Sequence, residues 1–267
     1  MGRRLGIVAG GGEFPLEAVA ALRREGVFCA VAGVRDAASP RLGEAADAFA
    51  WIGPGELDRL VAFLKGLDVP EAVLLGKVEH RTFVRDGAPG TELATRLSGL
   101  PDRRPATLLR FLIDALEAKG IEVLDPGFLL RPFFCPPGRL GRIEPSAEAG
   151  EDIDFGWPLA KRLADLDIGQ TVVVKRRAVV AVEGMEGTDE TIQRSRRLAG
   201  PGIVVLKVGR TLQDRRIDVP AVGLGTVRAL VAAQAAALCF EAATTPFFRK
   251  EDSLALAESS GLAVLAR

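Results

Sequence analysis

A cluster of acidic and basic side chains stands directly before an apolar segment in the stretch QDRRIDVPAVGLGTV, residues 213–227. A carboxylate fixed here, at Asp214 or Asp218, could bind Mg²⁺ or orient a water molecule. Arg215 and Arg216 would then either neutralise the charge of a phosphorylated substrate or pair with Asp214. A solvated, charged loop that leads into a buried strand is the simpler interpretation, and this stretch alone leaves both open.

The scarcity of histidine restricts the kinds of catalysis that this sequence can support. His80 is the only histidine, and the sequence has no tyrosine and no Gly-x-Ser-x-Gly segment. A Ser-His-Asp triad and a zinc hydrolase with imidazole ligands are therefore disfavoured. The cysteines Cys29, Cys135 and Cys239 are far apart and fit neither a CxxC metal site nor a disulfide framework. By elimination, acid–base or metal chemistry falls to Asp and Glu, assisted by Lys and Arg.

A glycine turn near the N-terminus is a candidate phosphate loop. The segment VAGGGEFP, residues 8–15, follows a strand-like run and opens a helical pattern, so its backbone N–H groups could meet a phosphate at the positive end of the helix. Pro15 occupies the place of the third glycine in the GxGxxG fingerprint, which argues against a nicotinamide cofactor and hence against a dehydrogenase. A plain tight turn is the alternative.

A second candidate loop is EGMEGTDET, residues 183–191. The structural interpretation is that Thr188 or Asp189 caps the helix that follows. The functional interpretation is that the same N–H groups and the Thr188 hydroxyl hold a phosphate, while Glu183, Glu186 or Asp189 faces a metal ion.

Two lysines are placed where strands end. Lys77 follows Gly76 at the carboxyl end of a predicted strand, which is where ligands bind in open α/β sheets. A side chain that merely extends into solvent from the sheet edge is the alternative. Lys207 and Gln213 crowd the same strand connection as Asp214, and they are candidate ligands for a phosphate group.

Alternating apolar patterns indicate how these residues are positioned. In the first half, strands are expected at 5–9, 27–34, 48–52, 72–75 and 121–124, and helices at 15–24, 55–67 and 92–119, the last interrupted near two prolines. Such alternation predicts a mostly parallel sheet.

The segment PFFCPPGRLGRIEPS, residues 132–146, has four prolines and two glycines and is the expected domain boundary. Beyond it we expect helices at 152–166, 188–198, 225–237 and 251–260, a hairpin of strands 171–174 and 179–182, and further strands at 203–208, 238–241 and 262–265. The second half is therefore also mixed α and β.

Composition excludes some partners. Lysine plus arginine and aspartate plus glutamate number 35 each, so no global field suggests a nucleic-acid partner. No apolar run is long enough to span a bilayer, no cleavable leader follows the first residues, and the cysteine pattern is that of a reducing cytoplasm.

Several segments together resemble the LpxI family of UDP-2,3-diacylglucosamine pyrophosphatases: GIVAGGGEFP, LLGKV, LDIGQTVVVK, VEGMEGTDE and the stretch from residue 213. The similarity covers nearly the whole chain. It implies an α/β protein of two domains: a Rossmann-like N-terminal domain with a mostly parallel sheet over 1–131, a proline-rich linker over 132–146, and a distinct mixed α/β catalytic domain over 147–267. The ligand is expected in a cleft between them.

The resemblance also implies site residues. The essential aspartate of the family's Val-Asp-Leu-Pro motif falls on Asp218, which is expected to be catalytic and, with Asp189, to bind the metal. The expected substrate-binding residues are Gly11, Gly12, Glu13, Phe14, Lys77, Gly187, Thr188, Asp189, Lys207, Gln213 and Arg216. Two departures stand out. Pro105 and Ala106 replace the paired acids of the family's Asp-Asp-x-Leu-Leu-Arg motif, and Arg210-Thr211 replaces Lys-Pro.

The implied activity is hydrolysis of UDP-2,3-diacylglucosamine to UMP and 2,3-diacylglucosamine 1-phosphate, in lipid A biosynthesis of Gram-negative bacteria, with Mg²⁺ or Mn²⁺ as cofactor. The acylated UDP-sugar would bring the protein to the cytoplasmic side of the inner membrane as a peripheral contact. Oligomeric state is left open, with a homodimer as one alternative. Because the paired acids are missing, a non-catalytic or weakly active protein that binds nucleotide sugars or lipids is the alternative function.

Overall fold

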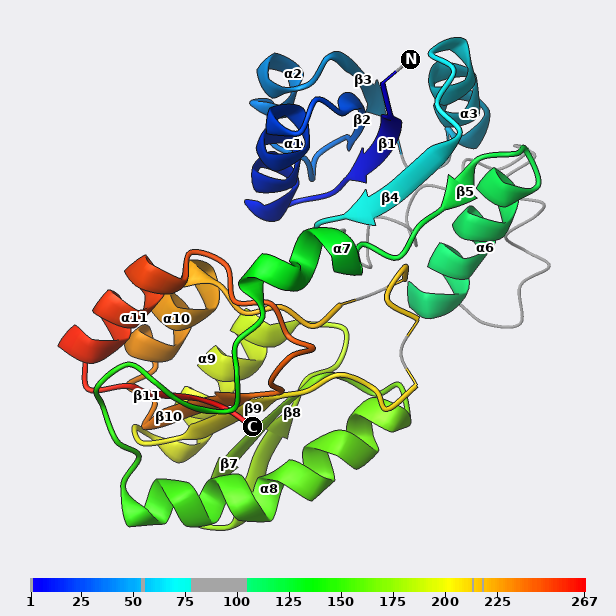
Figure 1. The fold of residues 1–267 in the computed structure, drawn as a ribbon. Helices are drawn as coiled ribbons and strands as arrows, with labels where there is room; N and C mark the ends of the chain where they lie inside the picture. Colours follow the sequence, from blue (N-terminus) through cyan, green and yellow to red (C-terminus); the bar gives the residue numbers. More distant parts are fainter. Residues whose placement is uncertain (1, 54–55, 78–104, 213, 218) are drawn as a thin grey trace. The chain divides into compact units, whose positions relative to one another are not determined.

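The computed structural model describes residues 2–53, 56–77, 105–212, 214–217 and 219–267 (Figure 1). The chain divides into two compact units. The first comprises Met1–Leu129 together with Asp214–Asp218, and the second comprises Leu130–Gln213 together with Val219–Arg267. A short segment of the second half of the sequence thus belongs to the first unit.

The first unit is built on a parallel sheet of strand order β3-β2-β1-β4-β5. Its strands are β1 (Arg4–Ala9), β2 (Phe28–Val34), β3 (Ala48–Ile52), β4 (Glu71–Leu75) and β5 (Glu122–Val123). This order is that of a dinucleotide-binding half sheet, and it confirms the expected Rossmann-like domain with a mostly parallel sheet. Nearly every residue of β1 and β2 is buried, as expected of strands covered on both faces.

Helices flank this sheet. They are α1 (Phe14–Arg24), α2 (Leu42–Ala45), α3 (Leu57–Gly66) and α6 (Pro105–Glu117), while the short helix α7 (Gly127–Leu130) follows β5 where the chain passes from the first unit to the second. Leu64 of α3 and Leu116 of α6 pack with Ala72 of β4 in one fully buried cluster, so α3 and α6 cover the same face. Pro15 lies in the first turn of α1, where its missing N–H costs no helical hydrogen bond.

The second unit has a mixed sheet of order β6-β11-β10-β9-β7-β8, in which β9, β10 and β11 run parallel and the outer strands pair antiparallel. Its strands are β6 (Gly138–Leu140), β7 (Thr171–Lys175), β8 (Ala178–Val182), β9 (Val204–Lys207), β10 (Ala237–Phe240) and β11 (Ala263–Ala266). The two separate sheets confirm the expected α/β architecture with a distinct mixed domain in the second half.

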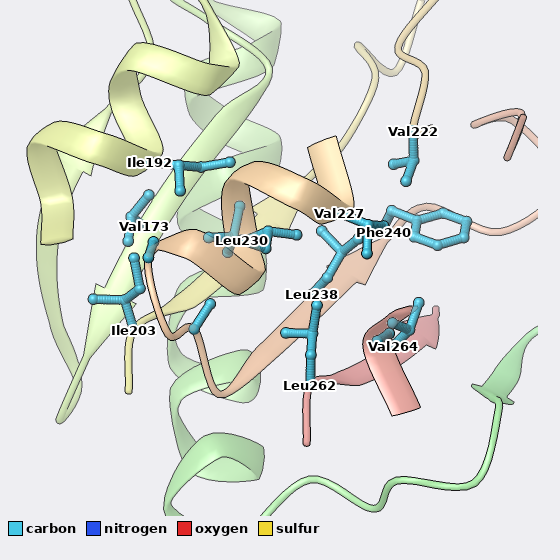
Figure 2. Packing of buried hydrophobic residues seen from close by; sticks show 14 of the residues in the cluster. Val173, Ile192, Ile203, Val222, Val227, Leu230, Leu238, Phe240, Leu262 and Val264 are labelled. Atoms are coloured by element: carbon cyan, nitrogen blue, oxygen red, sulfur yellow. The ribbon is translucent and has the colours of Figure 1, made fainter. Parts of the chain in front are cut away.

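Both faces of this second sheet are covered, and the strand residues alternate between them. Val172, Val174 and Leu206 pack with the long helix α8 (Ala147–Asp165). Val173 and Leu238 point to the opposite face, toward α9 (Thr188–Ala199), α10 (Leu224–Ala232) and α11 (Lys250–Ser259) (Figure 2). This alternation is the ordinary consequence of strand geometry, and it determines to which face of the sheet each side chain points.

Some elements differ from the sequence-based expectation. The alanine-rich helix expected over 225–237 ends at Ala232, because Ala237 already belongs to β10. The proline-rich segment contains the 3-10 helix Arg131–Phe133 and β6, which pairs with β11. The apolar residues after Asp218 form no strand, since Val222 makes only a single bridge to Phe247. The helical pattern expected before Pro105 lies outside the described residues. In the described part of the chain, no helix has the length and apolarity needed to cross a membrane.

Candidate functional site

The glycine turn after β1 is bound to the end of β4. The Gly10 N–H donates to the Leu75 carbonyl at 2.7 Å, and Gly11 and Lys77 exchange two backbone hydrogen bonds of 2.7 and 2.9 Å. Gly76 between them has φ +86°, and a Cβ there would lie 2.6 Å from the Gly11 carbonyl oxygen. The expectation of free N–H groups is therefore wrong for Gly10 and Gly11.

The same contact brings together two predicted site segments, because Lys77 now lies beside the glycine turn with an exposed side chain. Gly12 has φ +98° and open space where a Cβ would stand. Glu13 is exposed next to it, whereas Phe14 is buried at the start of α1. The turn after β1 therefore leaves the backbone at Gly12 accessible, as a ligand-binding turn requires.

The N-terminus of α9 is not capped by a side chain. Gly187 is the residue before the helix, with φ +83°, and no side-chain cap bond is formed. Thr188 instead accepts a hydrogen bond from Lys207 Nζ at 2.7 Å and donates one to Glu183 Oε1 at 3.0 Å. The capping interpretation of Thr188 is thus wrong, because its hydroxyl points toward the lysine. Asp189 lies in the first turn and is exposed.

Lys207 is the most unusual residue of this site. It ends β9 and is only 7% exposed, and its ammonium contacts the hydroxyls of Thr188 and, at 3.4 Å, of Thr171. Among the described residues no carboxylate lies within ion-pair distance of it. Glu183 is connected to it only through the Thr188 hydroxyl, and an ammonium removed from water without a direct counter-charge is unfavourable. Together with the positive end of α9, it makes this corner of the second unit suited to an anion.

Sequence reasoning missed Thr171 as a member of this cluster and did not foresee how Glu183 enters it. Thr171 opens β7 and stands directly opposite Lys207 in the antiparallel register. Glu183 follows β8, and its Oε2 atom is buried with no hydrogen-bond partner. The hairpin and its pairing with β9 bring these residues together, and only the strand register, which the sequence did not supply, could have revealed the contact.

The segment from Asp214 carries a second polar cluster, which lies within the first unit. The Asp214 carboxylate accepts from Arg216 Nε at 3.0 Å and Nη2 at 2.9 Å, and it pairs with Arg110 Nη2 of α6 at 2.9 Å. Arg216 Nη1 also reaches Glu117 Oε1 at 3.0 Å. Arg215 pairs more loosely with Asp125, at 3.5 Å. Of the two roles expected for the arginines, the structure displays pairing with Asp214 for Arg216.

These contacts favour the charged form of Asp214. The hydrogen bonds from the Arg216 side chain, followed by its backbone N–H and the charges of Arg216 and Arg110, hold the pKa of this carboxyl below its ordinary value of 3.8. The same partnership raises the pKa of Arg216. Both groups are therefore ionised throughout the neutral range.

Gln213, Asp218 and His80 lie outside the described residues. Within the residues that the structure does describe, no group of three or more His, Cys, Asp or Glu side chains is placed to hold a metal ion. The cysteines are buried and free, and burial raises the pKa of Cys239 to about 12 and of Cys29 to about 11. Such thiols stay protonated near neutral pH and are poor nucleophiles.

Fold and site together define a two-domain α/β protein with a Rossmann-like first domain and, in the second, a buried lysine at the N-terminus of a helix. The family model of the LpxI N-terminal domain matches residues 4–132, and that of the LpxI C-terminal domain matches residues 136–265. The chain is therefore a member of the LpxI family, as its motifs predicted.

A curated relative has 30% identity to the chain, in an alignment that covers 98% of the chain and 97% of the relative. It is the UDP-2,3-diacylglucosamine pyrophosphatase LpxI of Caulobacter vibrioides.

Solved structures are much more distant. A glycinamide-RNase-transformylase T from Mycobacterium tuberculosis is 14% identical, over 68% of this chain and 44% of its own, with a TM-score of 0.29. A phosphoribosylglycinamide synthetase from Anaerococcus prevotii is 12% identical, over 74% and 43%, with a TM-score of 0.25. The chain spans less than half of these proteins, and likenesses of this size have no bearing on its fold or function.

Proposed function

We propose that this protein hydrolyses the pyrophosphate of UDP-2,3-diacylglucosamine, giving UMP and 2,3-diacylglucosamine 1-phosphate, a step of lipid A biosynthesis. The Caulobacter relative carries the name of this activity and aligns along almost its entire length. Membership of the LpxI family in both domains supports the same assignment.

The observation that carries the proposal is the buried ammonium of Lys207, which has no direct ion pair with a described residue and contacts Thr188 at the N-terminus of α9. Cleavage of a pyrophosphate requires that negative charge on both phosphoryl groups be neutralised by fixed groups. Lys207 would supply a full positive charge and the amides of Thr188 and Asp189 would supply hydrogen bonds, with the Thr188 hydroxyl holding the lysine in place; the Gly187 N–H already donates to the Gly184 carbonyl. A phosphoryl group bound there would also relieve the unfavourable burial of the lysine.

The catalytic role falls to Asp218, for which the support is the family motif and the elimination of histidine and cysteine chemistry. Its carboxylate would orient the attacking water and accept its proton. The exposed Asp189 carboxylate, next to Thr188, is suited to hold a divalent cation together with the substrate, because Mg²⁺ in such sites uses one or two carboxylates plus phosphate oxygens. The family motif supports a metal-binding role for Asp218 as well. When bound, Mg²⁺ or Mn²⁺ would supply further charge neutralisation at the phosphates.

The other substrate contacts are proposed from the family motifs: Gly11, Gly12, Glu13, Phe14 and Lys77 at the end of the first sheet, Gln213, and Arg216. Support for the first group is the contact between the glycine turn and Lys77. The acyl chains of the substrate would keep the protein at the cytoplasmic face of the inner membrane as a peripheral contact, with a homodimer as one alternative state.

The test is to incubate the purified protein with UDP-2,3-diacylglucosamine and Mg²⁺ and to follow UMP and 2,3-diacylglucosamine 1-phosphate. Both should appear in equal amounts, and omission of the divalent ion should abolish them. Absence of UMP under all metal conditions would contradict the proposal.

One observation favours a second candidate, a protein that binds the acylated UDP-sugar without turning it over. Pro105 and Ala106 stand where relatives have paired acids, at the start of α6. This candidate predicts saturable binding of the substrate with no UMP, so a binding measurement on the same sample distinguishes the two.

A further inference from the structure

Two sequence segments that carry the family motifs meet in one ion pair. Arg110 ends the PATLLR segment of α6, and Asp214 opens the Asp-Arg-Arg-Ile-Asp segment, yet Arg110 Nη2 lies 2.9 Å from Asp214 Oδ2. We propose that Arg110, Asp214, Arg216 and Glu117 form a positioning cluster that fixes the backbone leading into Asp218. This inference rests on the proposed function, since it assigns these residues to the support of its catalytic carboxylate.

The side chains of Arg216 and Asp214 form several hydrogen bonds, both within the segment and to α6. The guanidinium of Arg216 directs Nε and Nη2 at Asp214 and Nη1 at Glu117, all between 2.9 and 3.0 Å. Asp214 also accepts the backbone N–H of Arg216 at 3.1 Å. A bidentate pair of this kind restricts orientation as well as distance. This pair holds the segment in one local geometry, while the contacts of Arg216 with Glu117 and of Asp214 with Arg110 attach it to α6.

The formal charge of the cluster also bears on its role. The cluster contains two guanidinium groups and two carboxylates, so its formal charges cancel. A group meant to neutralise a pyrophosphate needs positive charge that its own protein has not already paired, and both guanidinium groups of this cluster are in direct ion pairs. Charge balance thus assigns Arg110 to positioning, and it gives Arg216 a positioning role in addition to the substrate contact proposed above.

An apolar residue, Ile217, holds the other end of the segment. Ile217 packs against the buried cluster of the first unit that includes Ile113 and Leu116 of α6, and its N–H donates to the Asp214 carbonyl at 3.0 Å. The backbone is therefore closed into a turn at 214–217, with polar anchors at one end and an apolar anchor at the other. Asp218 is the next residue of the chain.

The physical reason for such a cluster is that a catalytic carboxylate must be held within a fraction of an ångström of its working geometry. An irregular charged segment has many accessible conformations, and ordering each residue costs about 1–2 kcal/mol of backbone entropy. Ordering the segment in advance removes that cost from the reaction itself. A displacement of about 1 Å lowers rates by roughly a hundredfold in comparable cases.

The test compares Arg110→Met, Arg110→Lys and Glu117→Gln with a matched control, Arg3→Met. Arg3 pairs with Glu71 at 3.0 Å and is as exposed as Arg110, at 47% for both side chains. In steady-state release of UMP, Arg110→Met should lower kcat roughly ten- to a hundredfold and change KM much less. Arg110→Lys should recover part of the loss, Glu117→Gln should show a smaller loss, and Arg3→Met should stay within about twofold of wild type, as expected of an exposed pair.

A second readout does not depend on turnover. Hydrogen exchange at the amides of Arg216 and Ile217 should become faster in Arg110→Met than in wild type or Arg3→Met. Unchanged exchange and unchanged kcat in a folded Arg110→Met protein would overturn the positioning role, and a rise in KM alone would make Arg110 a substrate contact. If wild type releases no UMP, the proposed function fails, while the exchange comparison still decides whether the cluster orders the segment. Should Arg110→Met not fold, Arg110→Lys and Glu117→Gln carry the comparison.

Discussion

At the scale of single residues, Lys207 and Asp214 represent two opposite uses of charge. Lys207 is buried beside hydroxyl groups and has no direct ion pair with a described residue, so a bound anion would stabilise its charge. Asp214 is held between two guanidinium groups of its own protein, so its charge is already compensated. The first arrangement suits a ligand site and the second suits a scaffold, and each leads to a different experimental signature.

Replacement of Lys207 by Met should separate binding from stability. Loss of a hydrogen bond from a charged group to a phosphate should weaken binding of UDP-2,3-diacylglucosamine by about 1.5–3 kcal/mol, or roughly ten- to a hundredfold. The stability of the unliganded protein should change little, because Met removes the desolvation cost of the buried ammonium but leaves the Glu183 carboxylate, which Lys207 reaches through Thr188, without that cation. Calorimetric titration and thermal unfolding measure the two effects. Thr188→Ala, which removes a hydroxyl partner of Lys207, should weaken binding less, and unchanged affinity in Lys207→Met would rule out the anion site.

Asp218→Ala should fold, bind the substrate and release almost no UMP, because loss of a group that orients the attacking water lowers kcat more than it changes binding. Rate and affinity are to be measured on one folded sample. A variant that keeps nearly the wild-type rate would show that Asp218 has no catalytic role. A variant that fails to fold would show that Asp218 is required for the structure.

Asp214 should make stability depend on pH in a defined direction. Its pKa in the folded protein lies below 3.8 because of the Arg216 hydrogen bonds. The lowered folded pKa means that its contribution is complete above the unfolded pKa and is lost as pH falls through the folded value. Wild type should therefore exceed Asp214→Asn in stability by about 1–2 kcal/mol at pH 7, with the difference shrinking below pH ~4. Urea unfolding at several pH values checks this, with Glu71→Gln as the exposed control. A difference that persists undiminished to pH ~3 would show that the charge of Asp214 is not its source.

At the scale of elements, the hairpin of β7 and β8 depends on one buried carboxylate of α8. Arg176 and Arg177 form its turn with φ of +50° and +56°, a left-handed conformation that arginine disfavours. Asp152 of α8, which is 2% exposed, accepts the backbone N–H groups of both, at 2.9 Å from Arg176 and at hydrogen-bond distance from Arg177. The helix thus stabilises a turn that the local sequence would not favour by itself.

Asp152→Ala should therefore destabilise the second unit by about 3 kcal/mol, since two hydrogen bonds to a charged acceptor are lost. Glu148→Ala is the matched control, because Glu148 contacts the Arg176 side chain only in an exposed pair and should cost less than about 0.5 kcal/mol. Chemical denaturation measures both. A loss in Asp152→Ala no larger than in the control would mean that the turn holds without the carboxylate. Arg177→Gly should restore part of the loss, because glycine accepts positive φ.

These elements also indicate how far sequence reasoning reaches. The central strands, most helices and the hairpin at 171–182 follow from local periodicity, and the structure agrees within a few residues. β6 could not be predicted, because its three residues become a strand only by pairing with β11, far along the chain. For the site, the sequence named Lys207 and Thr188 but not their contact, which needs the strand register and the helix position together. The pairing of Arg110 with Asp214 could not be predicted either, because it depends on how residues 214–217 pack against α6.

At the scale of the whole molecule, the first unit is incomplete without residues from the second half of the sequence. A fragment of residues 1–131 lacks the pairs of Asp214 and Arg216 with α6 and also the packing of Ile217. Its thermal midpoint should therefore lie at least ~5 °C below that of the same unit in the intact chain. Scanning calorimetry of fragment and full chain makes the comparison, with fragment plus a peptide of residues 212–219 as the rescue. Equal midpoints for fragment and intact chain would show that the late segment contributes nothing to the first unit.

This late segment also bears on synthesis at the ribosome. Arg216 follows its partner Glu117 by 99 residues. At elongation rates of about 5–20 residues per second, roughly 5–20 s separate the emergence of the two side chains from the exit tunnel. During that interval the nascent first unit lacks residues 214–217, and the apolar surface that Ile217 later covers is exposed to solvent. A chaperone that binds nascent chains would find this surface open until most of the second unit has been translated.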